Sequence, residues 1–134
     1  MSKFLYLKQI LQKYFEKRPE IKFAYLFGSV AQKRDNPLSD IDIAVMLDYR
    51  YIEEDLYPYG YKANLITDLI KILKTDKIDV VLLDKAPILL RHRVIYYGCL
   101  VFSRDEKERI NFQVETIKKY NDYKYIIKPH IKAG

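Results

Sequence analysis

Residues 26–47 read LFGSVAQKRDNPLSDIDIAVML, and this stretch decides the fold. An apolar run ends at Gly28-Ser29, a polar loop follows, and a second apolar run begins at Asp40 and Asp42. Residues i and i+2 of a strand project from the same face of a sheet, so the two carboxylates are predicted to lie together. The isoleucines next to them would point the opposite way, into the core. Two like charges this close are costly unless a cation neutralises them.

The rest of the chain alternates between helical and strand patterns. Apolar residues spaced by three and four predict helices, and short runs of β-branched and apolar residues predict strands. Helices are predicted over residues 3–17, 62–74, 87–97 and 105–127, and strands over residues 21–27, 40–47, 77–83 and 99–103. A short helical turn is predicted from Ser29 to about Arg34, and the last helix is predicted to end before Pro129. The fold class is therefore α/β (α+β), with a small mixed β-sheet of about four strands flanked by helices.

Length and composition predict one soluble domain over residues 1–134. Hydrophobic residues make up 49% of the chain and charged residues 31%, and no apolar run approaches the ~20 residues that cross a membrane. The lysine-rich N-terminus does not resemble a signal peptide. The single cysteine, Cys99, excludes an internal disulfide and a zinc cluster. We therefore expect a cytoplasmic protein that does not bind membranes, and its net charge of +6 would attract nucleotides, nucleic acids or acidic proteins.

A third carboxylate opens a later strand. Asp79 lies at the start of the strand predicted over residues 77–83. If this strand lies beside the one that carries Asp40 and Asp42, three carboxylates meet at one edge of the sheet. Oxygen ligands select hard divalent ions, Mg²⁺ or Mn²⁺. Two such ions about 3.5–4 Å apart would form a clamp for in-line displacement at phosphorus.

The residues upstream of the acidic pair are suited to an anion. Gly28 would let a phosphate approach the backbone closely. Ser29, at the start of a helical turn, would offer its hydroxyl and free N–H groups. Lys33 and Arg34 follow within about a turn and could screen the charge of a triphosphate. The sequence therefore predicts a nucleotide site beside a metal site.

Each of these features also has a purely structural interpretation. Ser39 and Asp42 fit a helix capping box, although the β-branched residues that follow argue against a helix there. A Gly-Ser pair after a strand is often only a turn, Asp79 alone could be a solvated carboxylate, and Lys33 and Arg34 could be solvated loop charges. The spacing of all these residues together favours the functional interpretation.

This combination of residues resembles a known family. Gly28-Ser29, ten intervening residues, Asp40-x-Asp42 and then Asp79 on a later strand resemble the pattern of polymerase-β-like nucleotidyltransferases. The small size and the ending APILLRHRVIYYGCLVFSRD (residues 86–105) are similar to the minimal nucleotidyltransferases, the MntA-type antitoxins of HEPN/MNT modules. The resemblance covers about residues 20–110. It implies the polymerase-β-like fold, with a C-terminal helix over about residues 105–127.

The resemblance also implies a chemistry. Asp40 and Asp42 would bind two Mg²⁺ ions, and Asp79 would bind the catalytic ion and help to activate the attacking hydroxyl. Gly28 and Ser29 would hold the β- and γ-phosphates of ATP. Antitoxins of this type transfer AMP from ATP to a tyrosine hydroxyl of the partner HEPN toxin, which silences it.

Alternatives remain open at this point. The acceptor could instead be an RNA 3′ end or the hydroxyl of a small molecule, or the chain could neutralise a toxin by docking alone. Homo- or hetero-oligomers are compatible with the sequence. Many relatives read Gly-Ser-x-Ala-Arg-Gly where this chain reads GSVAQK (residues 28–33), so Lys33 or Arg34 would have to replace the missing arginine.

Overall fold

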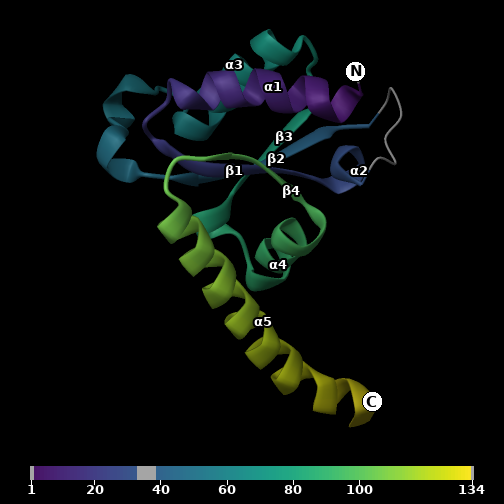
Figure 1. Cartoon of the computed structure of the whole chain (residues 1–134). Helices are drawn as coiled ribbons and strands as arrows, with labels where there is room; N and C mark the ends of the chain where they lie inside the picture. Colours follow the sequence, from purple (N-terminus) through teal and green to yellow (C-terminus); the bar gives the residue numbers. More distant parts are fainter. Residues whose placement is uncertain (1, 33–38, 134) are drawn as a thin grey trace.

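The computed structural model describes residues 2–32 and 39–133, with side chains as far as residue 126. Its helices are α1 (Lys3–Glu16), α2 (Gly28–Ala31), α3 (Tyr61–Leu73), α4 (Ile88–Tyr97) and α5 (Glu106–Ala133). Its strands are β1 (Ile21–Phe27), β2 (Ile41–Leu47), β3 (Ile78–Leu82) and β4 (Cys99–Ser103). Three short 3₁₀ helices, η1 (Tyr49–Tyr51), η2 (Glu54–Leu56) and η3 (Leu83–Lys85), lie in the connections. The predicted alternation of helices and strands is confirmed (Figure 1).

The four strands form one mixed sheet in the order β3-β2-β1-β4. Strand β1 is antiparallel to both β2 and β4, whereas β2 and β3 are parallel. Helices α1 and α3 cover one face of the sheet, and α4 and the first part of α5 lie on the other (Figure 1). The predicted fold class, a small mixed sheet flanked by helices, is therefore confirmed.

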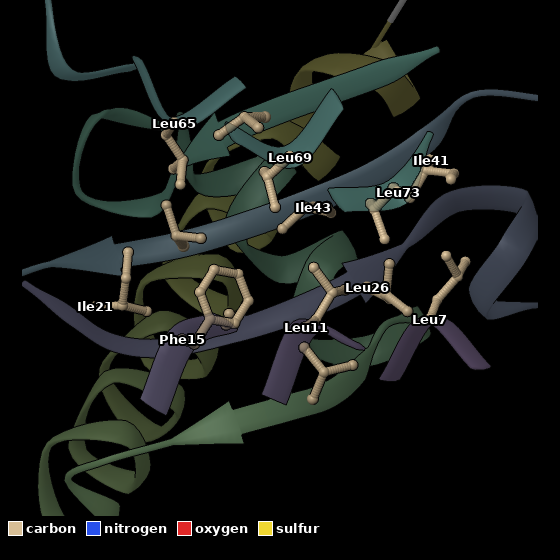
Figure 2. Close-up of a cluster of buried hydrophobic side chains, with 14 of the residues drawn as sticks. Leu7, Leu11, Phe15, Ile21, Leu26, Ile41, Ile43, Leu65, Leu69 and Leu73 are labelled. Atoms are coloured by element: carbon tan, nitrogen blue, oxygen red, sulfur yellow. The ribbon is translucent and has the colours of Figure 1, made fainter. Parts of the chain in front are cut away.

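The larger part of the core lies between the sheet and helices α1 and α3. Both helices place leucines or aromatic rings at spacings of three and four, so each presents one apolar face. The buried side chains drawn in Figure 2 include Leu7, Leu11, Phe15, Ile21, Leu26, Ile41, Ile43, Leu65, Leu69 and Leu73. Full burial of one such side chain stabilises the fold by about 1.5–3 kcal/mol. The isoleucines that flank Asp42 are thus fixed on this face, as the sequence predicted.

The opposite face of the sheet carries a smaller apolar cluster. Its buried members are Phe23, Tyr25, Ala44, Leu83 and Val94, from β1, β2, η3 and α4. Because side chains alternate along a strand, the residue two positions before Ala44 projects from this same face. That residue is Asp42, so the carboxylate lies at the end of the face that α4 covers.

The predicted C-terminal end of the last helix is wrong. Helix α5 continues to Ala133, whereas the sequence predicted an end before Pro129. Proline removes the hydrogen bond to the carbonyl four residues earlier, on Tyr125. This part of α5 projects away from the sheet (Figure 1), and Tyr125 is 82% exposed, so water can solvate that carbonyl in place of the missing hydrogen bond.

Two boundaries near the site also differ slightly from the prediction. Helix α2 ends at Ala31 instead of about Arg34, with Gln32 as its C-cap. Strand β2 begins at Ile41 instead of Asp40, because the backbone N–H of Ile41 makes the hydrogen bond to Lys77 (2.8 Å) that opens the ladder to β3. Within the two described ranges, none of the helices is both long and apolar enough to cross a membrane.

Candidate active site

Strand pairing brings the acidic residues together. In the parallel ladder of β2 and β3, Asp42 is the register partner of Asp79. In the antiparallel ladder of β1 and β2, Asp42 is the partner of Phe27, the residue immediately before Gly28. Side chains of directly paired residues lie on the same face of a sheet. The condition stated in the sequence analysis, that the strand of Asp79 lies beside the strand of Asp42, is therefore met.

The three carboxylates differ in exposure. Asp40 precedes β2 and is exposed, Asp79 is exposed on β3, and Asp42 between them is half-buried. Burial raises the pKa of Asp42 to about 6, and the charges of Asp79 and Asp40 act in the same direction. The three groups thus repel one another across the end of the sheet. A bound cation would remove this repulsion.

Gly28 lies directly against the Asp42 carboxylate. Its φ is +73°, in the left-handed region that favours glycine. A Cβ atom at this position would come within 2.2 Å of Asp42 Oδ2, so the carboxylate would have to move. Glycine is therefore favoured here both by the backbone conformation and by the position of the Asp42 carboxylate. Ser29 follows in the first turn of α2 and is partly exposed.

The acidic edge has the donor chemistry that a hard divalent ion prefers. All three side chains offer only carboxylate oxygens, and one of them already fills the space that a Cβ on Gly28 would take. Across residues 2–32 and 39–133, no three acidic, histidine or cysteine side chains are already gathered into a metal-binding cluster. Asp40 and Asp79 are exposed, so their side chains have room to rotate toward an ion. The side chains of Asp40, Asp42 and Asp79 are therefore the kind of oxygen ligand that Mg²⁺ or Mn²⁺ prefers.

A cleft of about 560 Å³ opens beside Asp79, and we call it the Asp79 cleft. Its other polar lining residues are Tyr49, Glu54, Tyr61, Lys62 and Lys85, from η1, η2, α3 and η3. The Tyr49 hydroxyl donates a hydrogen bond to Asp84 Oδ2 at 2.8 Å. Burial and this bond raise the pKa of Tyr49 to about 12, so its phenol stays protonated.

A second cleft of about 560 Å³ opens beside Gly28, and we call it the Gly28 cleft. Its lining residues come from the end of β1, from α2, from α4 and from α5: Phe27, Gly28, Gln32, Leu89, Leu90, His92, Arg93, Tyr97 and Tyr120. The His92 ring stacks on the Tyr120 ring, with centroids 3.5 Å apart and planes 8° from parallel. Leu90 of α4 lines both clefts, so its side chain lies between them.

The predicted site residues fall into two groups. The structure brings Asp42, Asp79 and Gly28 together, with Asp40 and Ser29 next to them in the chain. Lys33 and Arg34 lie outside the described residues, so their role stays a prediction.

Sequence reasoning missed the walls of the two clefts. Tyr49 and Lys85 lie in connections between the predicted elements, and Lys62 was predicted only as the start of a helix. No spacing rule links these residues, because the fold brings them together from separate connections. The concentration of tyrosine between residues 49 and 61 was the available signal.

Comparison with known proteins identifies the family of this chain. Residues 9–107 match the family described as Polymerase beta, Nucleotidyltransferase. The protein adenylyltransferase MntA of Aphanizomenon flos-aquae (strain 2012/KM1/D3) is 28% identical over 130 residues, which is 94% of this chain and 86% of the relative.

Solved structures share the fold. A crystal structure of a toxin–antitoxin with AMP-PNP superposes with a TM-score of 0.70 at 24% identity, covering 98% of each chain. A complex of the tri-AMPylated Shewanella oneidensis HEPN toxin with its MNT antitoxin gives a TM-score of 0.64 at 23% identity, covering 97% of this chain and 93% of the other. The family match covers residues 9–107, which is more than half of the chain and includes all four strands, and this chain therefore belongs to the polymerase beta nucleotidyltransferase family.

Proposed function

We propose that this chain transfers AMP from ATP to a tyrosine hydroxyl of a HEPN-domain toxin and so acts as its antitoxin. The observation that carries the proposal is the pairing of Asp42 with Asp79 directly beside the Gly28 turn. A reaction that needs both a metal and an anionic substrate explains why a half-buried carboxylate lies against a glycine with positive φ. The named relative, an adenylyltransferase, supports AMP as the transferred group.

Asp40, Asp42 and Asp79 would hold Mg²⁺ in this reaction. When bound, the metal neutralises phosphate charge and stabilises the leaving pyrophosphate. Asp42 is anchored on the sheet and would set the position of the site, while Asp40 and Asp79 would complete the ligand set from its exposed rim. This division of roles follows from their burial, because Asp42 is the least exposed of the three.

The ATP phosphates would lie at the Gly28-Ser29 turn. The glycine leaves its backbone open to a phosphate oxygen, and Ser29 can donate its hydroxyl and its N–H group. The adenosine would extend into the adjoining Gly28 cleft, whose aromatic lining suits a purine. Lys33 or Arg34 would screen the outer phosphates, in place of the Arg-Gly pair that many relatives carry. The relative solved with AMP-PNP supports ATP as the donor.

The bonds made and broken can be stated simply. The acceptor hydroxyl oxygen attacks the α-phosphorus of ATP, the bond from that phosphorus to the β-phosphate oxygen breaks, and pyrophosphate leaves. Asp79 lines the Asp79 cleft, where an acceptor could enter, so it would orient the acceptor hydroxyl and accept its proton.

A protein acceptor fits the surface of the chain. Ile110, Val114 and Ile117 are each close to half exposed at spacings of four and three along α5, so this helix presents an apolar stripe. Exposed stripes of this kind often mark protein interfaces. The solved complexes of MNT antitoxins with HEPN toxins support a HEPN partner, and the tri-AMPylated toxin supports successive transfers to one acceptor.

Labelling tests this proposal. The chain is co-purified with the HEPN protein encoded beside it and incubated with Mg²⁺ and ATP labelled on the α-phosphate. We expect label on a tyrosine of the partner, located by mass spectrometry, and none when the label is on the γ-phosphate. Label only on RNA would replace the protein acceptor by an RNA end, and no label on either would leave docking as the means of neutralisation.

A further inference from the structure

We propose that Arg93 of α4 binds the phosphates of the nucleotide donor, from the side of the Gly28 cleft opposite the Gly28-Ser29 turn. This inference rests on the proposed function, because it takes a nucleoside triphosphate as the donor. It adds a phosphate-binding residue from a helix that lies far from the Gly-Ser and Asp-x-Asp stretch in the sequence.

Arg93 faces the same cleft as the glycine of the turn. Arg93 reaches the Gly28 cleft from α4, and Gly28 reaches it from the start of α2. Leu89 and Tyr97, one helical turn before and one turn after Arg93, line this cleft too. Residues at this spacing lie on one side of a helix. Arg93 therefore belongs to the side of α4 that faces the cleft.

Packing fixes α4 beside the turn. Val94, the residue after Arg93, is fully buried in the smaller apolar cluster of the sheet. The last turn of α4 ends against β1, because a Cβ atom on Gly98 would lie only 3.3 Å from the Cβ of Phe27. Phe27 immediately precedes Gly28, and α4 also contacts α2. The backbone that carries Arg93 is thus held next to the proposed phosphate site.

The fold makes no use of the Arg93 guanidinium. Its side chain is exposed, and within residues 2–32 and 39–126 it has no ion-pair or hydrogen-bond partner. Arg91, two positions earlier, is different, because it donates hydrogen bonds to the carbonyl oxygens of Ala86 (2.8 Å) and Asp84 (2.8 Å). Arg91 therefore anchors the start of α4, while Arg93 keeps all its donors for a ligand.

The charge of the Gly28 cleft suits a polyanion. In the lining that the structure describes, Arg93 is the charged residue and there is no carboxylate. His92 also lines the cleft, but burial and the charge of Lys124 lower its pKa, so the imidazole is neutral at pH 7. A guanidinium can donate two parallel hydrogen bonds to one phosphate. Arg93 is therefore the side chain of this lining that can neutralise phosphate charge.

The α2 wall of the cleft shows where a second cation could stand. Gln32, the C-cap of α2, lines the Gly28 cleft together with Arg93. Many relatives carry arginine at this position of the Gly-Ser pattern, whereas this chain carries a neutral amide. An arginine at position 32 would bring its charge into the cleft that Arg93 reaches from α4. The two positions should therefore be interchangeable as sources of the phosphate contact.

Calorimetric titration of the full chain with Mg²⁺ and α,β-methylene-ATP measures this contact without any transfer. We expect Arg93→Ala to weaken binding about tenfold, because a charge-assisted hydrogen bond to phosphate is lost. Arg93→Lys should recover part of the affinity, since a lysine keeps the charge but not the paired donors. The control Lys71→Ala removes an exposed charge on α3 that does not line the cleft. Equal affinity of Arg93→Ala and Lys71→Ala would overturn the inference.

Adenosine separates the phosphates from the base. It has no phosphate, so Arg93→Ala should hardly change its affinity. An equal loss for adenosine and for α,β-methylene-ATP would point to a base contact or a distorted cleft, and would overturn the assignment to phosphate. Urea unfolding of Arg93→Ala should give nearly the wild-type free energy, because the side chain is exposed.

Moving the charge to the other wall gives the sharpest variant. The double variant Gln32→Arg/Arg93→Ala returns a guanidinium to the same cleft from α2. We expect it to regain most of the affinity that Arg93→Ala loses, which a purely structural role of Arg93 would not allow. No gain over Arg93→Ala would overturn the inference that both positions serve one phosphate site.

The outcome does not depend on the acceptor. If the wild type binds the nucleotide and Arg93→Ala binds it equally well, the inference fails and the proposed function stands. If binding depends on Arg93 but no partner is labelled, the inference stands and the proposed acceptor fails. A wild type that binds no nucleotide would overturn both.

Discussion

Asp42 on β2 and Asp79 on β3 are register partners in a parallel ladder, so two carboxylates stand side by side on one face of the sheet. Without a cation these charges repel each other, and burial prevents water from screening Asp42 fully. The pair therefore weakens the metal-free fold while it builds the site.

Asp79→Asn should stabilise the metal-free protein and abolish transfer. Removing one charge relieves the repulsion on Asp42, which we expect to raise the free energy of unfolding by about 1 kcal/mol at pH 7. Urea unfolding in EDTA measures this gain, and AMP transfer should fall at least about 100-fold. The control is Asp76→Asn, an exposed aspartate before β3, which should change neither quantity. Loss of stability in Asp79→Asn would contradict the account.

Gly28→Ala should cost both stability and nucleotide binding. The left-handed backbone costs a residue with a Cβ roughly 1–2 kcal/mol, and the new Cβ must also displace the Asp42 carboxylate. Gly60→Ala is the matched control, because Gly60 has φ +88° but no neighbouring atom within 4 Å of the place that an alanine methyl group would take. We expect similar backbone strain from both variants, measured by urea unfolding, and loss of Mg²⁺-ATP affinity only from Gly28→Ala. Equal ATP affinity in the two variants would show that the contact with Asp42 is unimportant.

Stability below pH 4 should depend on Asp48. Its hydrogen bonds with Arg50, partly offset by burial, lower the pKa of Asp48 to about 2. A lowered pKa stabilises the folded state above the unfolded pKa of about 3.9, and this contribution disappears as the pH falls toward 2. The Arg50 guanidinium is exposed, so we expect only about 1 kcal/mol at pH 6.

Asp48→Asn tests this dependence. The difference in unfolding free energy between the wild type and the variant, measured by urea unfolding, should be present at pH 6 and shrink between pH 4 and pH 2. A difference that stays constant over this range would show that the carboxylate charge contributes nothing.

Arg104 should hold helix α1 to the sheet. Its Nη2 group donates to the carbonyl oxygens of Phe15 (2.7 Å), Arg18 (3.1 Å) and Glu16 (3.2 Å), just after β4 ends. Hydrogen bonds from a charged donor contribute about 1.5–3 kcal/mol together with the favourable charge at a helix C-terminus. We expect Arg104→Ala to cost about 2 kcal/mol in urea unfolding, and Arg104→Lys to recover part of it. Arg93→Ala, at an exposed position without such bonds, should cost much less.

The sequence predicted most of the fold because its apolar patterns agree with local geometry. Leu7, Leu11 and Phe15 repeat at helical spacing, and the alternation of Ile41, Asp42 and Ile43 separates core from site. Which strand lies beside β2 could not be read from local patterns, since pairing depends on the whole sheet. The continuation of α5 past Pro129 was missed because local rules ignore how freely a helix end is solvated.

The same distinction between local patterns and the whole fold applies to the residues of the site. Asp40, Asp42 and Gly28 lie within one short stretch, so their spacing alone predicted them. Tyr49 and Lys85 reach the Asp79 cleft from separate connections, and only the folded chain brings them to one place.

The direct test of the central claim compares neutralisation with labelling in one variant. Asp42→Asn keeps the size of the side chain and removes the charge that would hold Mg²⁺. The variant and the wild type are each co-expressed with the HEPN partner, and growth and AMP on the partner are measured in the same cultures. We predict that Asp42→Asn loses both the AMP label and the rescue of growth, while the wild type and the Asp76→Asn control retain both. Rescue of growth by Asp42→Asn without any label would contradict the account, because neutralisation would then need no transfer.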